Sequence, residues 1–175
     1  GFGERLVAIR VNPADSEWHD ADVAAVAGSA AQLAVLPKVE ASALAADVAN
    51  RIAKPLLCMV ETPRGVLDAV GIAAVPGVAG LIGGMNDLAN ELHIPPGSGR
   101  AGLSFALQTI VLAARAGGGW ALDGVFNDLN DTEALAAECR EGRMYGFDGK
   151  TLIHPNQIDT ANSVWSPSAA EIDDA

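Results

Sequence analysis

Short apolar runs alternate along the chain with longer stretches in which apolar and polar positions recur at the spacing of an α-helix. The short runs have the length of buried strands, and the longer stretches have the length of helices. The runs predict strands at residues 6–11, 32–37, 56–61, 78–82, 123–126 and 149–153. The intervening stretches predict helices at residues 21–31, 41–53, 103–116, 132–145 and 155–164, with a further helix starting at Pro63.

This alternation is typical of the α/β class, in which helices cover a parallel sheet. Two architectures fit it, a closed TIM (β/α)8 barrel and an open doubly wound sheet. No Gly-x-Gly-x-x-Gly motif follows the first strand, and we therefore expect the barrel. A complete barrel needs at least about 200 residues, whereas this chain has 175 residues. We expect residues 1–175 to form a single, partial TIM-barrel domain, with the open sheet as the alternative.

Composition narrows the possible partners. Half of the residues are hydrophobic and 19% are charged, so the chain can bury a core of its own. The net charge of −11 argues against a nucleic-acid partner, because phosphate backbones attract basic surfaces. No apolar run approaches the roughly 20 residues of a membrane-spanning helix. Cys58 and Cys139 lie in apolar or helical stretches, so we expect reduced cysteines in a cytoplasmic protein rather than a disulfide.

Two carboxylates stand where predicted strands end. Glu61 closes the run at 56–61, and Asp87 follows the run at 78–82 after a glycine-rich turn. In a parallel barrel the carboxyl ends of the strands share one face, where active sites are built. Hard oxygen ligands suit Mg²⁺, which usually takes one or two carboxylates and leaves its other positions to water and substrate. The pattern predicts a Mg²⁺ site at Glu61 and Asp87, with two capping or ion-paired acids as the alternative.

Two basic residues occupy equivalent strand ends. Arg10 can bind a substrate carboxylate through two parallel hydrogen bonds, or it can brace the barrel end through an ion pair. Lys38 can bind an acidic group or act as a Schiff-base amine. For Lys38 we favour an ion pair with a carboxylate at the barrel mouth over the Schiff base.

Further candidates flank these positions. Gly84, Met85 and Asn86 precede Asp87, and their backbone N–H groups can bind a carboxylate or enolate oxygen unless the glycines only form a tight turn. His154 follows the last predicted strand and can act as an acid or base, but we favour a turn-stabilising role. The Gly- and Pro-rich stretch 91–102 is expected to shape a pocket.

Five motifs in series resemble the citrate lyase beta subunit family, within the HpcH/HpaI aldolase and malyl-CoA lyase superfamily. They are RVN at 10–12, LPKVE at 36–40, ETPRG at 61–65, GLIGGMNDL at 80–88 and GFDGKTLIHPNQ at 146–157. The last motif is similar to the acyl-CoA branch of the superfamily rather than to the free-pyruvate aldolase branch.

The resemblance implies a TIM barrel that uses Mg²⁺, often as a homo-trimer or hexamer. Such enzymes cleave or form a carbon–carbon bond in a citryl-, malyl- or citramalyl-type CoA thioester, giving an acyl-CoA and a 2-oxoacid such as oxaloacetate, glyoxylate or pyruvate. The resemblance implies that Glu61 and Asp87 hold Mg²⁺ and that Arg10 binds the 2-oxoacid carboxylate, which makes these three the catalytic candidates. The substrate-binding candidates are Arg10, Lys38, Gly84, Met85 and Asn86.

The chain departs from the family pattern in two respects. Family members usually carry two further βα units before the first strand seen here, and a C-terminal segment after the last helix. We therefore expect a fragment of a longer barrel. The general base is not evident. The alternatives are an acyl-CoA thioester hydrolase, a free 2-oxoacid aldolase on the same scaffold, and a non-catalytic partner-binding subunit.

Overall fold

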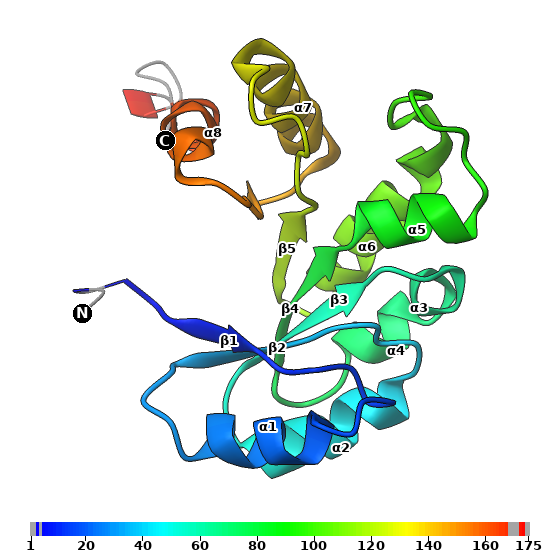
Figure 1. Cartoon of the computed structure of the whole chain (residues 1–175), viewed down its shortest axis with the longest axis vertical. Helices are drawn as coiled ribbons and strands as arrows, with labels where there is room; N and C mark the ends of the chain where they lie inside the picture. The colour runs from blue at the N-terminus through cyan, green and yellow to red at the C-terminus, as the bar shows by residue number, and fades with distance from the viewer. Residues whose placement is uncertain (1–2, 4, 168–171, 174–175) are drawn as a thin grey trace.

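The computed structural model describes residues 3, 5–167 and 172–173. Its centre is a six-stranded parallel sheet whose order in space, β1-β2-β3-β4-β5-β6, follows the order in the sequence (Figure 1). The strands are β1 (Ala8–Arg10), β2 (Leu33–Leu36), β3 (Leu56–Val60), β4 (Val78–Gly83), β5 (Trp120–Asp123) and β6 (Gly149–Lys150). Because every pair is parallel, the carboxyl ends of all six strands lie at one edge of the sheet.

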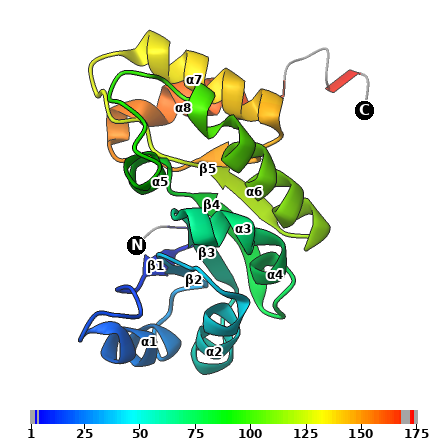
Figure 2. The same ribbon diagram turned by 90° about the vertical axis from the view of Figure 1, so that its right-hand side faces the viewer.

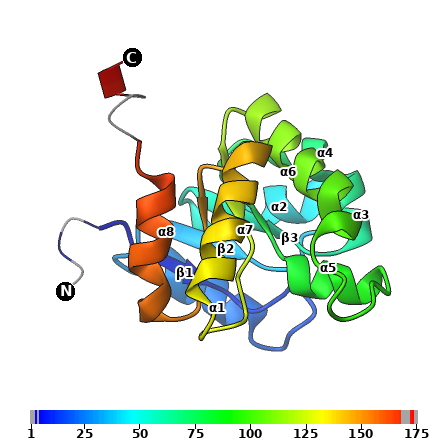
Figure 3. The same cartoon turned by 90° about the horizontal axis from the view of Figure 1, so that it is seen from above.

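Helices connect the strands, as parallel pairing requires. They are α1 (His19–Ala27), α2 (Ser42–Ile52), α3 (Pro63–Leu67), α4 (Ala69–Ala73), α5 (Met85–Glu91), α6 (Ser104–Ala116), α7 (Thr132–Tyr145) and α8 (Ile158–Trp165), with 3-10 turns η1 (Ala101–Leu103) and η2 (Pro155–Gln157). Helices α1 and α2 lie at one end of the molecule (Figure 2), and α7 and α8 lie side by side at the other (Figure 3). Within the described ranges, no helix has the length and apolar character needed to cross a membrane.

The two faces of the sheet are covered differently. Leu36, Leu56 and Leu81 are fully buried and belong to the main core, which also contains apolar residues of the helices. Leu57 and Ile82, their neighbours along the strands, belong to a second cluster made of strand residues alone. Since successive side chains of a strand point to opposite faces, the helices cover one face and the strands themselves line the other. The interior of a TIM barrel is lined in the same way.

The α/β class and the parallel sheet predicted from the sequence are confirmed. In the part of the chain that the structure describes, the sheet is open, because β1 and β6 each pair with one other strand. The helix expected from Pro63 divides at Asp68, which ends α3 and begins α4. The helix expected at 155–164 divides into η2 and α8.

The prediction for the fifth strand is wrong in position, since the sequence predicts it at 123–126 and the structure places β5 at Trp120–Asp123. Trp120 pairs with Gly80, where an added Cβ would lie 2.5 Å from the Trp120 carbonyl oxygen, so a glycine is needed for this close approach. Asp123 ends the strand, where the prediction begins it, and is fully buried. Buried cations from other parts of the chain stabilise it there.

Candidate active site

Glu61 directly follows β3 and is only 7% exposed. Its Oε1 accepts a 2.7 Å hydrogen bond from the backbone N–H of Lys38, which follows β2. Lys38 has a left-handed backbone, with φ of 51°, and this turn brings its N–H to the carboxylate. On the other side, the Thr62 side chain caps α3 by accepting a 3.1 Å hydrogen bond from the Gly65 N–H. Both the carboxylate and the backbone around it are therefore fixed.

Three charged residues, Asp87, Lys38 and Arg10, lie near this carboxylate. Burial raises the pKa of Glu61, and the negative charge of Asp87 raises it further. The hydrogen bond from the Lys38 N–H lowers the pKa of Glu61, as do the positive charges of Lys38 and Arg10, but burial prevails. The structure thus brings Asp87, Arg10 and Lys38 within electrostatic reach of Glu61 at the carboxyl edge of the sheet.

The two basic side chains are free to meet a ligand. Arg10 ends β1 and is exposed. Among the described residues, neither the Arg10 guanidinium nor the Lys38 amine forms a hydrogen bond or an ion pair. The expected ion pair of Lys38 is therefore wrong for this part of the chain, because the left-handed backbone presents its N–H, and not its amine, to Glu61.

Asp87 lies in the first turn of α5 and is exposed. Gly84 is the N-cap of this helix, and its N–H donates a 2.9 Å hydrogen bond to the Val60 carbonyl, which ties α5 to the end of β3. The N–H groups of Met85, Asn86 and Asp87 begin the helix and so have no intrahelical acceptor. These three N–H groups are therefore available to a ligand. The Gly84 N–H is not, because it is already bonded to the Val60 carbonyl.

This donor set fits Mg²⁺. In the described ranges, no three His, Cys, Asp or Glu side chains form a group that could hold a metal by themselves. Glu61 and Asp87 therefore offer two carboxylates near the side chains of Arg10 and Lys38, and they do not form a complete set of metal ligands. Mg²⁺ commonly binds through one or two carboxylates together with water and substrate, while a structural Zn²⁺ site would need four ligands.

The family of the protein follows from its sequence. The sequence model of the family described as HpcH/HpaI aldolase/citrate lyase matches residues 3–155. This chain belongs to that family. The resemblance that the five strand-end motifs indicate is confirmed, and the strand ends that carry Arg10, Glu61 and Asp87 all lie within the match.

Relatives of this HpcH/HpaI family member include a (3S)-malyl-CoA thioesterase of Cereibacter sphaeroides. It is 47% identical over 173 residues, which cover 98% of this chain and 61% of the relative. The chain therefore spans about three fifths of the length of this relative.

Two solved structures from Mycobacterium tuberculosis share the fold. A citrate lyase beta subunit complexed with oxaloacetate and magnesium has a TM-score of 0.81 and 34% identity, covering 91% of this chain and 73% of that one. The protein CitE in complex with magnesium, acetoacetate and coenzyme A has a TM-score of 0.83 and 33% identity, covering 93% of this chain and 62% of that one.

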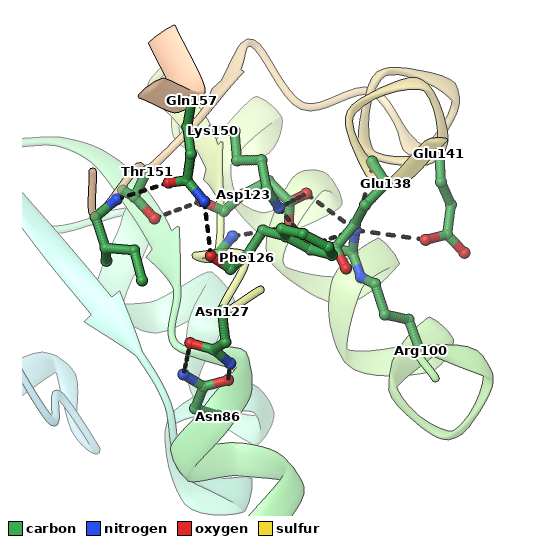
Figure 4. Close-up of polar contacts among 12 residues, drawn as sticks. Asn86, Arg100, Asp123, Phe126, Asn127, Glu138, Glu141, Lys150, Thr151 and Gln157 are labelled. Atoms are coloured by element: carbon green, nitrogen blue, oxygen red, sulfur yellow. Dashed lines mark hydrogen bonds and ion pairs between the residues drawn. The ribbon is translucent and has the colours of Figure 1, made fainter. Parts of the chain in front are cut away.

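A buried ionic network near the end of β5 was not predicted from the sequence. Asp123 and the Lys150 side chain are fully buried, with Lys150 Nζ 3.1 Å from Asp123 Oδ2 and 2.6 Å from Glu138 Oε1 (Figure 4). Arg100 binds the same Asp123 carboxylate with both terminal nitrogens, at 2.7 and 3.1 Å, and lies 3.4 Å from Glu141. The sequence signals that could have indicated this network were Lys150 in the predicted last strand and Asp123 in the predicted fifth strand.

A cavity of about 740 Å³ lies beside this network. Residues 94–100 form one wall, within the Gly- and Pro-rich stretch 91–102, and α5 and residues 125–128 form others. Arg100 belongs to both the wall and the ionic network, so the network anchors this loop to the end of β5. His154, by contrast, uses its Nδ1 to accept a 3.2 Å hydrogen bond from the Asn156 N–H, which is the turn-stabilising role favoured from the sequence.

Proposed function

We propose that this protein is a Mg²⁺-dependent enzyme that acts on a malyl-type CoA thioester. The observation that carries the proposal is the meeting of Glu61 and Asp87 with two free cations, Arg10 and Lys38, at the carboxyl edge of the sheet. A malyl group carries a carboxylate next to a hydroxyl group, so Mg²⁺ can bind oxygens of both while a cation binds the carboxylate. The names of the C. sphaeroides and M. tuberculosis relatives support the same substrate class.

Each residue has a proposed role. Glu61 and Asp87 hold the metal ion, which as a Lewis acid would polarise a chelated hydroxyl or carbonyl oxygen. Arg10 binds the carboxylate of the substrate through parallel hydrogen bonds. Lys38 adds positive charge and fixes Glu61 through its N–H. The free N–H groups that begin α5, from Met85 to Asp87, bind the remaining oxygens of the same ligand.

Two reactions can start from this complex. In hydrolysis, water attacks the thioester carbon, and the carbon–sulfur bond breaks to release malate and CoA. In carbon–carbon cleavage, a base removes the hydroxyl proton, glyoxylate leaves, and the acetyl-CoA enolate takes up a proton. We place hydrolysis first, because the thioesterase of C. sphaeroides is 47% identical. The carbon–carbon lyase expected from the sequence motifs is the second candidate, supported by the likeness to the citrate lyase beta subunit.

We further propose that the six strands are part of an eight-stranded TIM barrel in the whole protein. The chain spans 61% of the C. sphaeroides relative, and its uncovered sheet face is lined like a barrel interior. A homo-trimer or hexamer is proposed as well. Leu67, Phe105 and Leu112 are 82%, 71% and 70% exposed on α3 and α6, and a subunit contact there would remove these apolar side chains from water. The two free, buried cysteines fit a cytoplasmic location.

Metal binding tests the site directly. Titration of the protein with Mg²⁺ and oxaloacetate or pyruvate should show 2-oxoacid binding that is lost with a chelator. Glu61→Gln and Asp87→Asn keep the side-chain shape and should abolish Mg²⁺ binding, whereas Asp159→Asn, on the exposed first turn of α8, should not. Unchanged Mg²⁺ affinity in both site variants would overturn the metal assignment.

Products separate the two reactions. With malyl-CoA and Mg²⁺, a thioesterase releases one free thiol per substrate and no glyoxylate, while a lyase releases glyoxylate and leaves the thioester intact. Arg10→Lys should weaken substrate binding more than it weakens Mg²⁺ binding, because lysine cannot form the bidentate contact. A folded, full-length protein that binds neither Mg²⁺ nor a 2-oxoacid would leave a non-catalytic partner-binding subunit.

A further inference from the structure

The first turn of α5, which carries Asp87, is pressed against the segment that follows β5. A Cβ on Gly124 would lie 2.8 Å from the Gly83 carbonyl oxygen and 3.0 Å from Met85 Cγ, so only a glycine allows this contact. The register of α5 relative to the sheet is therefore set by residues far along the chain, as well as by its own strand.

A reciprocal amide pair joins the same two segments. Asn86 Nδ2 donates to Asn127 Oδ1 at 3.1 Å, and Asn127 Nδ2 donates back to Asn86 Oδ1 at 2.8 Å (Figure 4). Each amide is donor and acceptor at once, so both side chains are fixed in one orientation. Asn86 directly precedes Asp87 in the first turn of the helix, and the pair therefore restrains the backbone that carries the carboxylate.

The segment that holds Asn127 is itself rigidly held. Asp123 is clamped by Arg100 and Lys150, and its Oδ1 accepts a 2.7 Å hydrogen bond from the Gly124 N–H. Three residues on, the Phe126 carbonyl accepts a 2.9 Å hydrogen bond from the buried Gln157. These contacts hold the segment between the buried Asp123 and the pair of Asn86 with Asn127.

We infer that Asn127 is a positioning residue for the Mg²⁺ site, acting through Asn86 to hold Asp87 in place relative to Glu61. This inference rests on the proposed function, because it assigns a role only if Asp87 is a metal ligand. Residues that orient metal ligands without touching the metal ion typically contribute about 10-fold to 100-fold to metal affinity. The two asparagines lie at the exposed rim of the site, so their loss should not prevent folding.

A double-mutant cycle tests the inference with Mn²⁺ as a spectroscopic probe of the site. Affinity is measured from the free Mn²⁺ signal in electron paramagnetic resonance, on the wild type, Asn86→Ala, Asn127→Ala and the double variant. Each single variant should weaken Mn²⁺ binding about 10-fold. The double variant should lose no more than either single one, since both changes break the same pair. The line shape of bound Mn²⁺ should change in all three variants.

The control is Asn156→Ala, which removes a 3.0 Å amide hydrogen bond to the Leu129 carbonyl in the neighbouring loop without touching α5. It should leave Mn²⁺ affinity and line shape unchanged. If the wild type binds Mn²⁺ and Asn127→Ala binds it equally well, this inference is overturned and the metal site is kept. The same holds if the loss of Mn²⁺ affinity in the double variant equals the product of the two single losses. Absence of Mn²⁺ binding in the wild type overturns the metal site and this inference together.

Discussion

The backbone of Gly84 lies directly against the side chain of Glu61. A Cβ built at residue 84 would lie 2.2 Å from Glu61 Cβ and 2.6 Å from its Oε2. Since the Gly84 N–H is also bonded to the Val60 carbonyl, neither partner can move away without breaking the end of β3 or the start of α5. The glycine is therefore part of the carboxylate site, because it leaves the space that Glu61 occupies.

Gly84→Ala should displace Glu61 and weaken Mg²⁺ binding by at least about 10-fold. Isothermal titration with Mg²⁺ measures the loss. The matched control is Gly28→Ala at the C-cap of α1, where the new Cβ would have no contact closer than 3.8 Å. An alanine at 84 that binds Mg²⁺ like the wild type would mean that Glu61 is not a ligand in its observed position.

Asp123→Ala should destabilise the protein by about 3–5 kcal/mol, because it leaves the buried Lys150 and Arg100 without their shared carboxylate. Lys150→Met should cost less, since Asp123 keeps its two bonds to Arg100. Urea denaturation of the two variants compares the losses. Arg51→Met, which breaks only exposed ion pairs with Asp20 and Asp47, should leave the midpoint unchanged.

Gln157→Leu should cost about 1–3 kcal/mol of stability. The amide of this residue, 2% exposed, accepts from the Ile153 N–H at 3.1 Å and donates to the Phe126 carbonyl, so leucine leaves both backbone groups unpaired. Thermal or urea unfolding measures the change. Ser163→Ala on the exposed face of α8, the helix that follows Gln157, should have no measurable effect, and equal losses in both variants would contradict the assigned role.

The stability of the protein should fall in acid partly through Asp148. Burial acts to raise the pKa of this carboxyl, but hydrogen bonds from Arg115 and the Ala121 N–H outweigh it and hold the pKa below the usual 3.8. The ionised form is thus favoured in the folded state. Its contribution is present above about pH 4 and is lost as the pH falls through the lowered pKa.

Asp148→Asn should therefore be less stable than the wild type near pH 7, by less than about 1 kcal/mol because the pair with Arg115 is half exposed. The difference should shrink below pH 4. Urea denaturation of both proteins between pH 3 and 7 measures it. A difference that stays constant over this range would show that the charge of Asp148 does not contribute.

The sequence predicts best those elements that are surrounded only by apolar residues. The apolar run at 56–61 needs only burial in a parallel sheet, and β3 lies there as predicted. The fifth strand was predicted to begin at Asp123, whereas β5 ends there, because Arg100 and Lys150 neutralise the carboxylate and allow it to be buried at the end of the strand. A local pattern cannot show a charge partner that lies far away in the sequence.

Some features of the candidate site could be predicted from the sequence, and others could not. The residue types and spacing of the chain by themselves determined the α/β class, the parallel sheet, and the strand ends that carry Arg10, Glu61 and Asp87. They did so because side-chain periodicity and strand-end position are properties of local sequence.

Only the tertiary structure decided how those ends are held. The Lys38 N–H on Glu61, the space left by Gly84, and the pair of Asn86 with Asn127 join residues that are 23 to 41 positions apart. Such contacts depend on the orientation of two backbones at a distance of a few ångströms. The sequence of either segment alone does not contain that orientation.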